Sequence, residues 1–257
     1  MNNRPLTIEH FCSLFSRLTY FSTWEVEGFL DKNNVVHPID HDTKVISTVF
    51  ERFCSPVIYT IAKYNSYKIE KANQTTYPDF TLTHSATGHR IALDVKTTYQ
   101  QKTMVLTLGS YKSYLVSNTK NILHPYDTYH DHWIIGFIYE QKPTFPEYDL
   151  SNMPRPGAIE CPYRVKTIFI REKYAITGLR AASGNTTNIG SIPVTQPDRF
   201  QTECGPFMFF RDGKGACDHY WKGYETYMHD IRYLSQLLNH PDFQQYHPDF
   251  EKFHNAF

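Results

Sequence analysis

The chain has 257 residues, and its 26 lysines and arginines balance 26 aspartates and glutamates, so the formal net charge is zero. With 40% hydrophobic and 20% charged residues, the composition is that of a globular domain and excludes a disordered or collagen-like chain. A neutral total does not indicate nucleic-acid binding by itself, so a DNA site would need a local basic cleft balanced by acidic surfaces elsewhere.

The cysteines and the N-terminus indicate the compartment. The five cysteines are scattered, and no two form a Cys-x-x-Cys pair. Such a set is typical of reduced thiols rather than of a disulfide framework. Residues 1–15 lack the apolar stretch of a signal peptide, and the longest apolar run, 133–139, is too short to span a membrane. We expect a cytoplasmic protein with no membrane association.

Residues 42–64 are expected to form a helix. Asp42 or Thr43 can cap its start, and Pro56 is expected to kink or split it. Its apolar residues follow helical spacing at Val45, Ile46, Val49, Phe50, Phe53 and Val57. The opposite stripe is polar and carries Lys44, Ser47, Glu51 and Ser55.

A β-hairpin is predicted next. Phe80 and Leu82 alternate with polar residues, and residues 85–88, Ser-Ala-Thr-Gly, can turn the chain. The returning strand has apolar residues at Ile91, Leu93 and Val95, which alternate with more polar positions. This period of two is typical of a half-buried strand.

The remaining elements predict an α/β fold with a mixed β-sheet flanked by helices. Residues 133–139 are almost continuously apolar and suit a central strand buried on both faces. Residues 165–170 and 174–179 are expected to form two further strands, and 218–238 a helix. The proline-rich segment 141–164 is expected to be an irregular excursion.

Three charged residues of the predicted hairpin indicate a reaction centre. Asp94 and Lys96 lie two apart on one strand, so they project from the same face, about 7 Å apart. If the hairpin folds between residues 86 and 87, Asp79 lies opposite Asp94. Two facing carboxylates repel unless a cation lies between them, and Mg²⁺ prefers such oxygen ligands. Lys96 would orient the attacking water and stabilise the developing negative charge.

Other interpretations of these residues are weaker. An Asp-x-Lys sequence alone is common on solvated strands, and only its combination with Pro78-Asp79 at hairpin spacing favours a nuclease. The closely spaced His124, His130 and His132 could suggest zinc, but no matching set of cysteines or histidines accompanies them.

Several longer strings closely resemble type II restriction endonucleases of the EcoRV family, within the PD-(D/E)xK nuclease superfamily. They are Tyr77-Pro78-Asp79-Phe80-Thr81-Leu82, Asp94-Val95-Lys96-Thr97-Thr98-Tyr99, Asn118-Thr119-Lys120-Asn121-Ile122, His132-Trp133-Ile134-Ile135-Gly136, residues 183–192 (Ser-Gly-Asn-Thr-Thr-Asn-Ile-Gly-Ser-Ile), and the helix start at 42–51. The strings stand in the same order, and the resemblance covers roughly residues 36–225.

The resemblance implies a single restriction-endonuclease domain over residues 1–257, with a restriction-endonuclease-like core. It implies a homodimer that surrounds double-stranded DNA, with the helix at 42–64 in the dimerising part and residues 73–225 in the catalytic and recognition part. The implied reaction is Mg²⁺-dependent hydrolysis, with Mn²⁺ as a substitute, that leaves 5′-phosphates. Asp79, Asp94 and Glu51 then correspond to metal ligands, and Lys96 to the active-site lysine.

The same resemblance implies how the DNA sequence is read. The loop Ala182, Ser183, Gly184, Asn185 and Thr186 would enter the major groove. An asparagine such as Asn185 can bond adenine N6 and N7 together, and the methyl of Thr186 can pack on thymine. The expected target is GATATC, cut bluntly at its centre. Ala182, however, stands where the resembling family sequence has glycine.

Further residues are expected to contact the DNA backbone or the minor groove. By the resemblance, a minor-groove loop corresponds to Asn73, Gln74 and Thr75, and several residues of this loop differ from those of the resembling family sequence. The candidates for phosphate contacts are Thr43, Lys44, Thr98, Ser113, Lys120 and Asn188.

Two alternatives share the fold. A repair or junction nuclease would prefer branched DNA, and an inactive DNA-binding protein would lack the chemistry. The Asn185-Thr186 loop favours the sequence-specific enzyme, and the presence of all three charged residues argues against the inactive one. A restriction enzyme also implies a cognate DNA methyltransferase in the cell.

Overall fold

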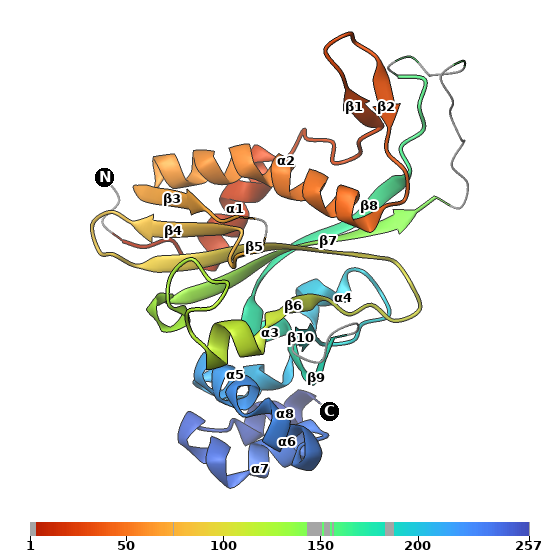
Figure 1. The fold of residues 1–257 in the computed structure, drawn as a ribbon. Helices are drawn as coiled ribbons and strands as arrows, with labels where there is room; N and C mark the ends of the chain where they lie inside the picture. Colours follow the sequence, from red (N-terminus) through yellow and green to blue (C-terminus); the bar gives the residue numbers. More distant parts are fainter. Residues whose placement is uncertain are drawn as a thin grey trace.

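The computed structural model describes residues 4–73, 75–142, 151, 155, 157–182 and 188–256. Its centre is a five-stranded sheet in the order β3-β4-β5-β7-β8 (Figure 1). These strands are β3 (Tyr67–Lys71), β4 (Phe80–His84), β5 (Arg90–Tyr99), β7 (Asp131–Gln141) and β8 (Tyr163–Glu172). Strands β5 and β7 are parallel and the other pairs antiparallel, so the predicted mixed sheet is confirmed.

Strand β7 is the central strand that its apolar run predicts. Residues 132–139 are all buried, because helices and strands cover both faces of the sheet. Trp133, Ile135 and Phe137 belong to the hydrophobic cluster on the α2 side of the sheet. The alternating residues Ile134 and Ile138 belong to a second cluster on the opposite side.

Helix α2 (Thr43–Tyr64) lies across one face of the sheet together with α1 (Ile8–Leu18) (Figure 1). The Asp42 side chain caps α2 by accepting hydrogen bonds from the backbone N–H groups of residues 44 and 45. Of the two outcomes expected of Pro56, a kink or a split, the split does not occur, because α2 continues through this residue. A proline inside a helix removes one backbone hydrogen bond and crowds the carbonyl four residues earlier. Cys54 and Ile58 on either side of it both pack into the core, which offsets this cost.

Helix α2 is also the one described helix that is long and apolar enough to cross a membrane by length and composition. Its buried stripe packs on the sheet. The five cysteines are free thiols, as their scattered positions predict.

A small sheet and a group of helices cover the other face of the main sheet. The small sheet has the order β6-β10-β9, formed by β6 (Thr107–Ser110), β10 (Asn188–Ser191) and β9 (Thr177–Ala181). The helices are α3 (Lys173–Ile176), α4 (Arg199–Thr202), α5 (Gly213–Lys222), α6 (Tyr224–Asp230), α7 (Leu234–Asn239) and α8 (Phe250–Ala256), with short η helices at Lys112–Val116, Tyr126–Thr128, Pro206–Phe209 and Pro241–Tyr246.

The structure differs from the sequence-based prediction in one strand and one helix. The strand expected at 174–179 begins only at Thr177, because residues 173–176 form the helical turn α3. The single helix expected at 218–238 is three helices, α5 to α7. Gly223 ends α5, its N–H bonding the His219 carbonyl, and an extended segment at residues 231–233 separates α6 from α7.

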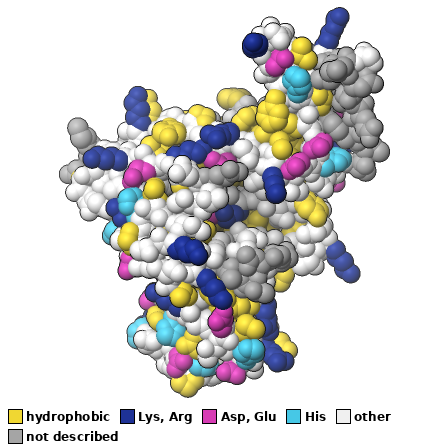
Figure 2. Space-filling model, viewed as in Figure 1, with side chains coloured by type: hydrophobic (Ala, Val, Ile, Leu, Met, Phe, Trp, Pro, Cys, Tyr) yellow, Lys and Arg dark blue, Asp and Glu magenta, His cyan; other side chains and the backbone are white. Residues whose placement is uncertain are grey.

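A two-stranded arm, β1 (Gly28–Leu30) and β2 (Val36–Pro38), rises beside the start of α2 (Figure 1). Between arm and helix lies an apolar groove of about 480 Å³, lined by Val26, Phe29, Leu30, Val45, Val49 and Phe53 among others. Figure 2 shows hydrophobic side chains gathered where the arm meets the helix. Phe29 and Leu30 are 52% and 61% exposed. We call this feature the arm groove.

Candidate active site

The site forms where strand β4 stops and β5 continues without it. The β4–β5 register pairs Phe80 with Leu93, which sets Asp79 opposite Asp94 as the predicted hairpin midpoint requires. Pro78 has no N–H and cannot continue the ladder. In its place, the carboxylate of Asp79 accepts a 2.7 Å hydrogen bond from the backbone N–H of Val95. An acidic side chain thus replaces a backbone partner at the open edge of β5.

Asp94 is in direct contact with both Asp79 and Lys96. The backbone N–H of Asp79 donates to Asp94 Oδ1 at 3.4 Å. The ammonium of Lys96 lies 2.5 Å from Asp94 Oδ2. Asp94 is only 2% exposed, while Leu93 and Val95 anchor the α2-facing side of the strand. The structure therefore brings together the three charged residues that the sequence singles out.

Burial and mutual repulsion shape the electrostatics of this centre. Burial raises the pKa of Asp79 well above its usual value, and the nearby charge of Asp94 raises it further. Burial alone would lower the pKa of Lys96, but the attraction of Asp94 and Asp79 outweighs that effect and raises it. Two acids share one lysine, so the centre favours an additional cation.

A polar cleft of about 610 Å³ separates helix α2 from the open edge of β5. Among the residues that line it are six that the sequence marks as functional: Thr43, Lys44, Glu51, Asp79, Lys96 and Thr98. The polar stripe predicted for the helix faces this cleft, because its apolar stripe packs on the sheet. Asp94 lies beneath the cleft lining.

The donor set fits a hard divalent cation held by two carboxylates. Glu51, the third acid of the expected set, forms an ion pair with Lys71 at 2.7 Å. Accordingly, no group of three His, Cys, Asp or Glu residues gathers closely enough to hold an ion anywhere in the described part of the chain. Mg²⁺ is commonly held by one or two carboxylates plus substrate phosphate oxygens, and Asp79 and Asp94 satisfy that requirement.

The residues expected to contact DNA lie at several places around the site. Asn73 and Thr75 are exposed in the segment that leads to Asp79, and Lys120 is also exposed. Ser113 and Asn188 lie near each other but do not line the cleft: the Ser113 N–H donates to Ser110 Oγ at 3.3 Å, and Asn188 pairs with Ser110 across the small sheet.

Of the expected major-groove loop, only Ala182 is described. Its N–H donates to the Asn188 carbonyl at 3.1 Å and closes the base of the loop, so this N–H is already engaged. Gln74, Ser183, Gly184, Asn185 and Thr186 lie outside the described residues.

The structure contains a buried lysine near the acid pair that is not predicted from the sequence. Lys173 is 3% exposed, and its ammonium lies 4.8 Å from the centroid of the Tyr77 ring, two residues before Asp79. Its Nζ has no hydrogen-bond acceptor among the residues described. Burial lowers the pKa of Lys173 to about 8. No sequence signal marks it, because a lysine between two strands resembles an exposed turn residue.

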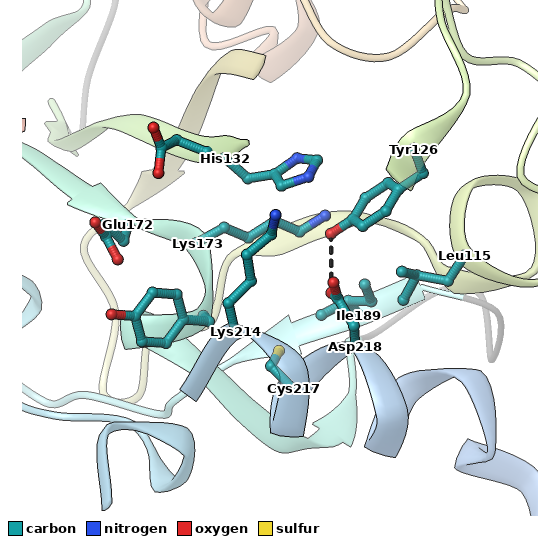
Figure 3. A pocket seen from close by; sticks show the side chains of 11 residues that line it. Leu115, Tyr126, His132, Glu172, Lys173, Ile189, Lys214, Cys217 and Asp218 are labelled. Carbon is teal, nitrogen blue, oxygen red and sulfur yellow. Dashed lines mark hydrogen bonds between the residues drawn. The ribbon is translucent and has the colours of Figure 1, made fainter. Parts of the chain in front are cut away.

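Figure 3 shows the small cavity around this lysine, in which the ammonium groups of Lys173 and Lys214 lie between the rings of His132 and Tyr126. The cavity holds about 20 Å³, room for one water. His132 is bonded through Nδ1 to the Tyr77 hydroxyl at 2.7 Å. His124 instead pairs with Glu70, so the three histidines do not assemble a zinc site.

Comparisons with known proteins match this chain to restriction enzymes. The family model described as restriction endonuclease EcoRV matches residues 21–250. The type II restriction enzyme EcoRV of Escherichia coli is 38% identical over 217 residues, which cover 79% of this chain and 83% of that protein. Among solved structures, the NlaIV restriction endonuclease superposes with a TM-score of 0.50 at 11% identity, covering 97% of this chain and 95% of the other.

Proposed function

The chain belongs to the EcoRV family of type II restriction endonucleases, hydrolases that act on phosphodiester bonds, and from this we propose that it cuts GATATC bluntly at the centre and leaves 5′-phosphates. The observation that carries the chemistry is the contact of Asp79, Asp94 and Lys96 at the open edge of β5, beside a cleft. The target sequence rests on the resemblance of the loop at 182–187 to that of the family.

In the proposed mechanism, Asp79 and Asp94 are the residues that would hold the cation, beside the place that the scissile phosphate would take. Bound Mg²⁺, or Mn²⁺ in its place, would lower the pKa of a water and polarise the phosphoryl oxygen. Lys96, positioned by Asp94, orients the attacking water and stabilises the negative charge that develops on the phosphate. The negative charges of Asp94 and Asp79 keep that ammonium charged.

The cleft wall formed by α2 is proposed to position the DNA backbone. Thr43 and Lys44 stand at the N-terminal end of this helix and line the cleft, where the positive end of the helix dipole and the ammonium of Lys44 favour phosphates. Thr98 lines the cleft on the β5 side. The remaining proposed contacts are Asn73, Gln74 and Thr75 toward the minor groove, Ser113, Lys120 and Asn188 on phosphates, and Ala182 to Thr186 on bases.

The arm groove supports a homodimer. Exposed apolar patches rimmed by polar residues mark interaction surfaces, and this one joins Phe29 and Leu30 to the outer face of α2. A symmetric duplex target needs one active centre for each strand, which a two-fold dimer supplies. The 42–64 helix would then take part in dimerisation, and residues 73–225 in catalysis and recognition.

Cleavage of plasmids tests the proposal. A plasmid with one GATATC site, incubated with the protein and Mg²⁺, should give a single linear product with blunt, 5′-phosphorylated ends. A matched plasmid without the site should stay intact, and Asp94→Ala should leave both uncut. Sequencing the fragment ends would reveal a different target. Cleavage of branched DNA alone would identify a junction nuclease, and binding without products an inactive protein.

The cellular setting follows from the proposed activity. An enzyme that cuts duplex DNA at a fixed sequence endangers its own chromosome, so we infer a cognate DNA methyltransferase in the same cell. The free thiols of all five cysteines agree with a reducing cytoplasm.

A further inference from the structure

Glu51 is paired with a lysine to which the proposed mechanism gives no role. The ammonium of Lys71 lies 2.7 Å from Glu51 Oε1, and the two side chains are only 23% and 28% exposed. Lys71 ends strand β3 directly across from Phe80, the residue after Asp79. The ion pair therefore links the cleft wall formed by α2 to the strand next to the acid pair.

Three contacts hold Lys71 in this position. Besides Glu51, its ammonium lies 3.5 Å from Ser55 Oγ and 5.1 Å from the centroid of the buried Phe80 ring. The Ser55 hydroxyl donates a hydrogen bond to the backbone carbonyl oxygen of Glu51. The Ser55 oxygen is therefore left to accept a hydrogen bond from Lys71. A lysine with a carboxylate, a hydroxyl and an aromatic face around it differs from a solvated surface lysine.

The ion pair between Glu51 and Lys71 reduces the number of carboxylates that the cleft can provide to a metal ion. Glu51 lines the same cleft as Asp79 and Lys96, yet no three acids converge on one point within the residues that the structure describes. We propose that Lys71 is a positioning residue that holds Glu51 out of the metal site. Glu51 then becomes a ligand only when a cation replaces the lysine as its partner. This inference rests on the proposed role of Asp79 and Asp94 as metal ligands.

Binding of Mn²⁺ to the protein without DNA tests this role apart from cleavage. Lys71→Met keeps an unbranched apolar side chain over Phe80 and removes the competing charge. We expect its dissociation constant for Mn²⁺, measured by electron paramagnetic resonance titration, to fall about fivefold or more. Lys71→Arg should bind Mn²⁺ like the wild type. Circular dichroism and thermal unfolding would confirm that each variant is folded.

Two further variants separate the pair from a general change of charge. Lys68→Met removes an exposed lysine of the same strand that points to the other face, and it should alter the dissociation constant less than twofold. With Glu51→Gln as background, Lys71→Met should no longer tighten binding. An unchanged or weaker affinity in Lys71→Met, or the same gain in the Glu51→Gln background or in Lys68→Met, would overturn the inference.

The metal site itself has a separate control. Asp79→Ala should lose Mn²⁺ binding whether or not Lys71 is present. If Asp79→Ala binds like the wild type, the acid pair is not the metal site, and the proposed mechanism fails together with this inference. If Asp79→Ala loses binding but Lys71→Met does not tighten it, only the role of Lys71 is refuted.

Discussion

Asp79 and Asp94 face each other across the end of the β4–β5 pair, and the backbone N–H of one donates to the carboxylate of the other at 3.4 Å. Like charges directly opposite in an antiparallel pair destabilise it. This repulsion occurs where the sheet borders the cleft. A local arrangement that lowers the stability of the fold is typical of a functional site.

Replacing one acid should therefore stabilise the protein while it removes activity. In Asp79→Asn the amide oxygen can still accept from the Val95 N–H, and the repulsion is gone. We expect loss of cleavage and a gain of about 1 kcal/mol in the free energy of unfolding at neutral pH without metal, measured by urea denaturation.

The pH dependence of that gain follows from the sign of the pKa shift. The folded-state pKa of Asp79 lies above its usual value of 3.8, so the folded wild type binds more protons than the unfolded chain between the two values. Its stability therefore falls as pH rises through that window. The advantage of Asp79→Asn should vanish below about pH 4. An advantage independent of pH would contradict this explanation.

Lys96→Ala should abolish cleavage without abolishing DNA binding. The ammonium is proposed to stabilise charge that appears only in the transition state, so we expect the cleavage rate to fall at least about 100-fold. Single-turnover cleavage would measure the rate, and a gel-shift assay the binding. A rate within a few-fold of the wild type would remove Lys96 from the catalytic role.

Lys173→Met should stabilise the protein at neutral pH. Burial lowers the pKa of Lys173 from 10.5 to about 8, so the charged form is costly in the folded state below pH 8, by up to about 3 kcal/mol. Between pH 8 and 10.5 the folded wild type loses this proton before the unfolded chain does, so its relative stability rises with pH. The advantage of Lys173→Met should shrink across that range in urea denaturation, and an advantage that grows would refute the assignment.

Lys44→Ala and Asn185→Ala should weaken DNA binding in different ways. Lys44 is a proposed phosphate contact, so its loss should lower affinity for all sequences and reduce the slope of log affinity against log salt by about 1. Asn185 is a proposed base contact, so its loss should cost about 1–3 kcal/mol of discrimination at one adenine. Binding titrations at several salt concentrations, with cognate and altered duplexes, distinguish the two effects.

Introducing a charged residue into the arm groove should weaken dimerisation if this groove is the proposed dimer interface. Phe29→Asp or Leu30→Asp places a carboxylate on an exposed apolar surface, so the monomer should stay folded while association weakens. Sedimentation velocity would show a monomer where the wild type sediments as a dimer. The same mass for both proteins would place the dimer interface elsewhere or exclude a dimer.

Local periodicity explains which parts of the fold could be predicted. The alternation at Ile91, Leu93 and Val95, with Gly88 in the turn at a positive φ of 72°, determined the hairpin register and hence the facing of Asp79 and Asp94. The cap at Asp42 and the apolar stripe of α2 likewise depend only on neighbours along the chain.

The contacts that sequence reasoning missed depend on packing between distant segments. Lys71 and Lys173 are ordinary lysines in the sequence, and only the folded chain brings them to Glu51 and to Tyr77. Strand β3 is not predicted, because three of its five residues are charged and only Tyr67 and Ile69 alternate with them.

Because β5 lies inside the main sheet, its active-site residues are displaced only when the sheet itself unfolds. Asp94 and Lys96 lie in a strand bonded along nine residues to the buried strand β7, and such strands exchange their amide hydrogens only in the rarest openings. Local opening of the arm, whose Phe29 and Leu30 are exposed, should therefore leave the active site intact. The temperature at which cutting stops irreversibly should coincide with the melting of the sheet.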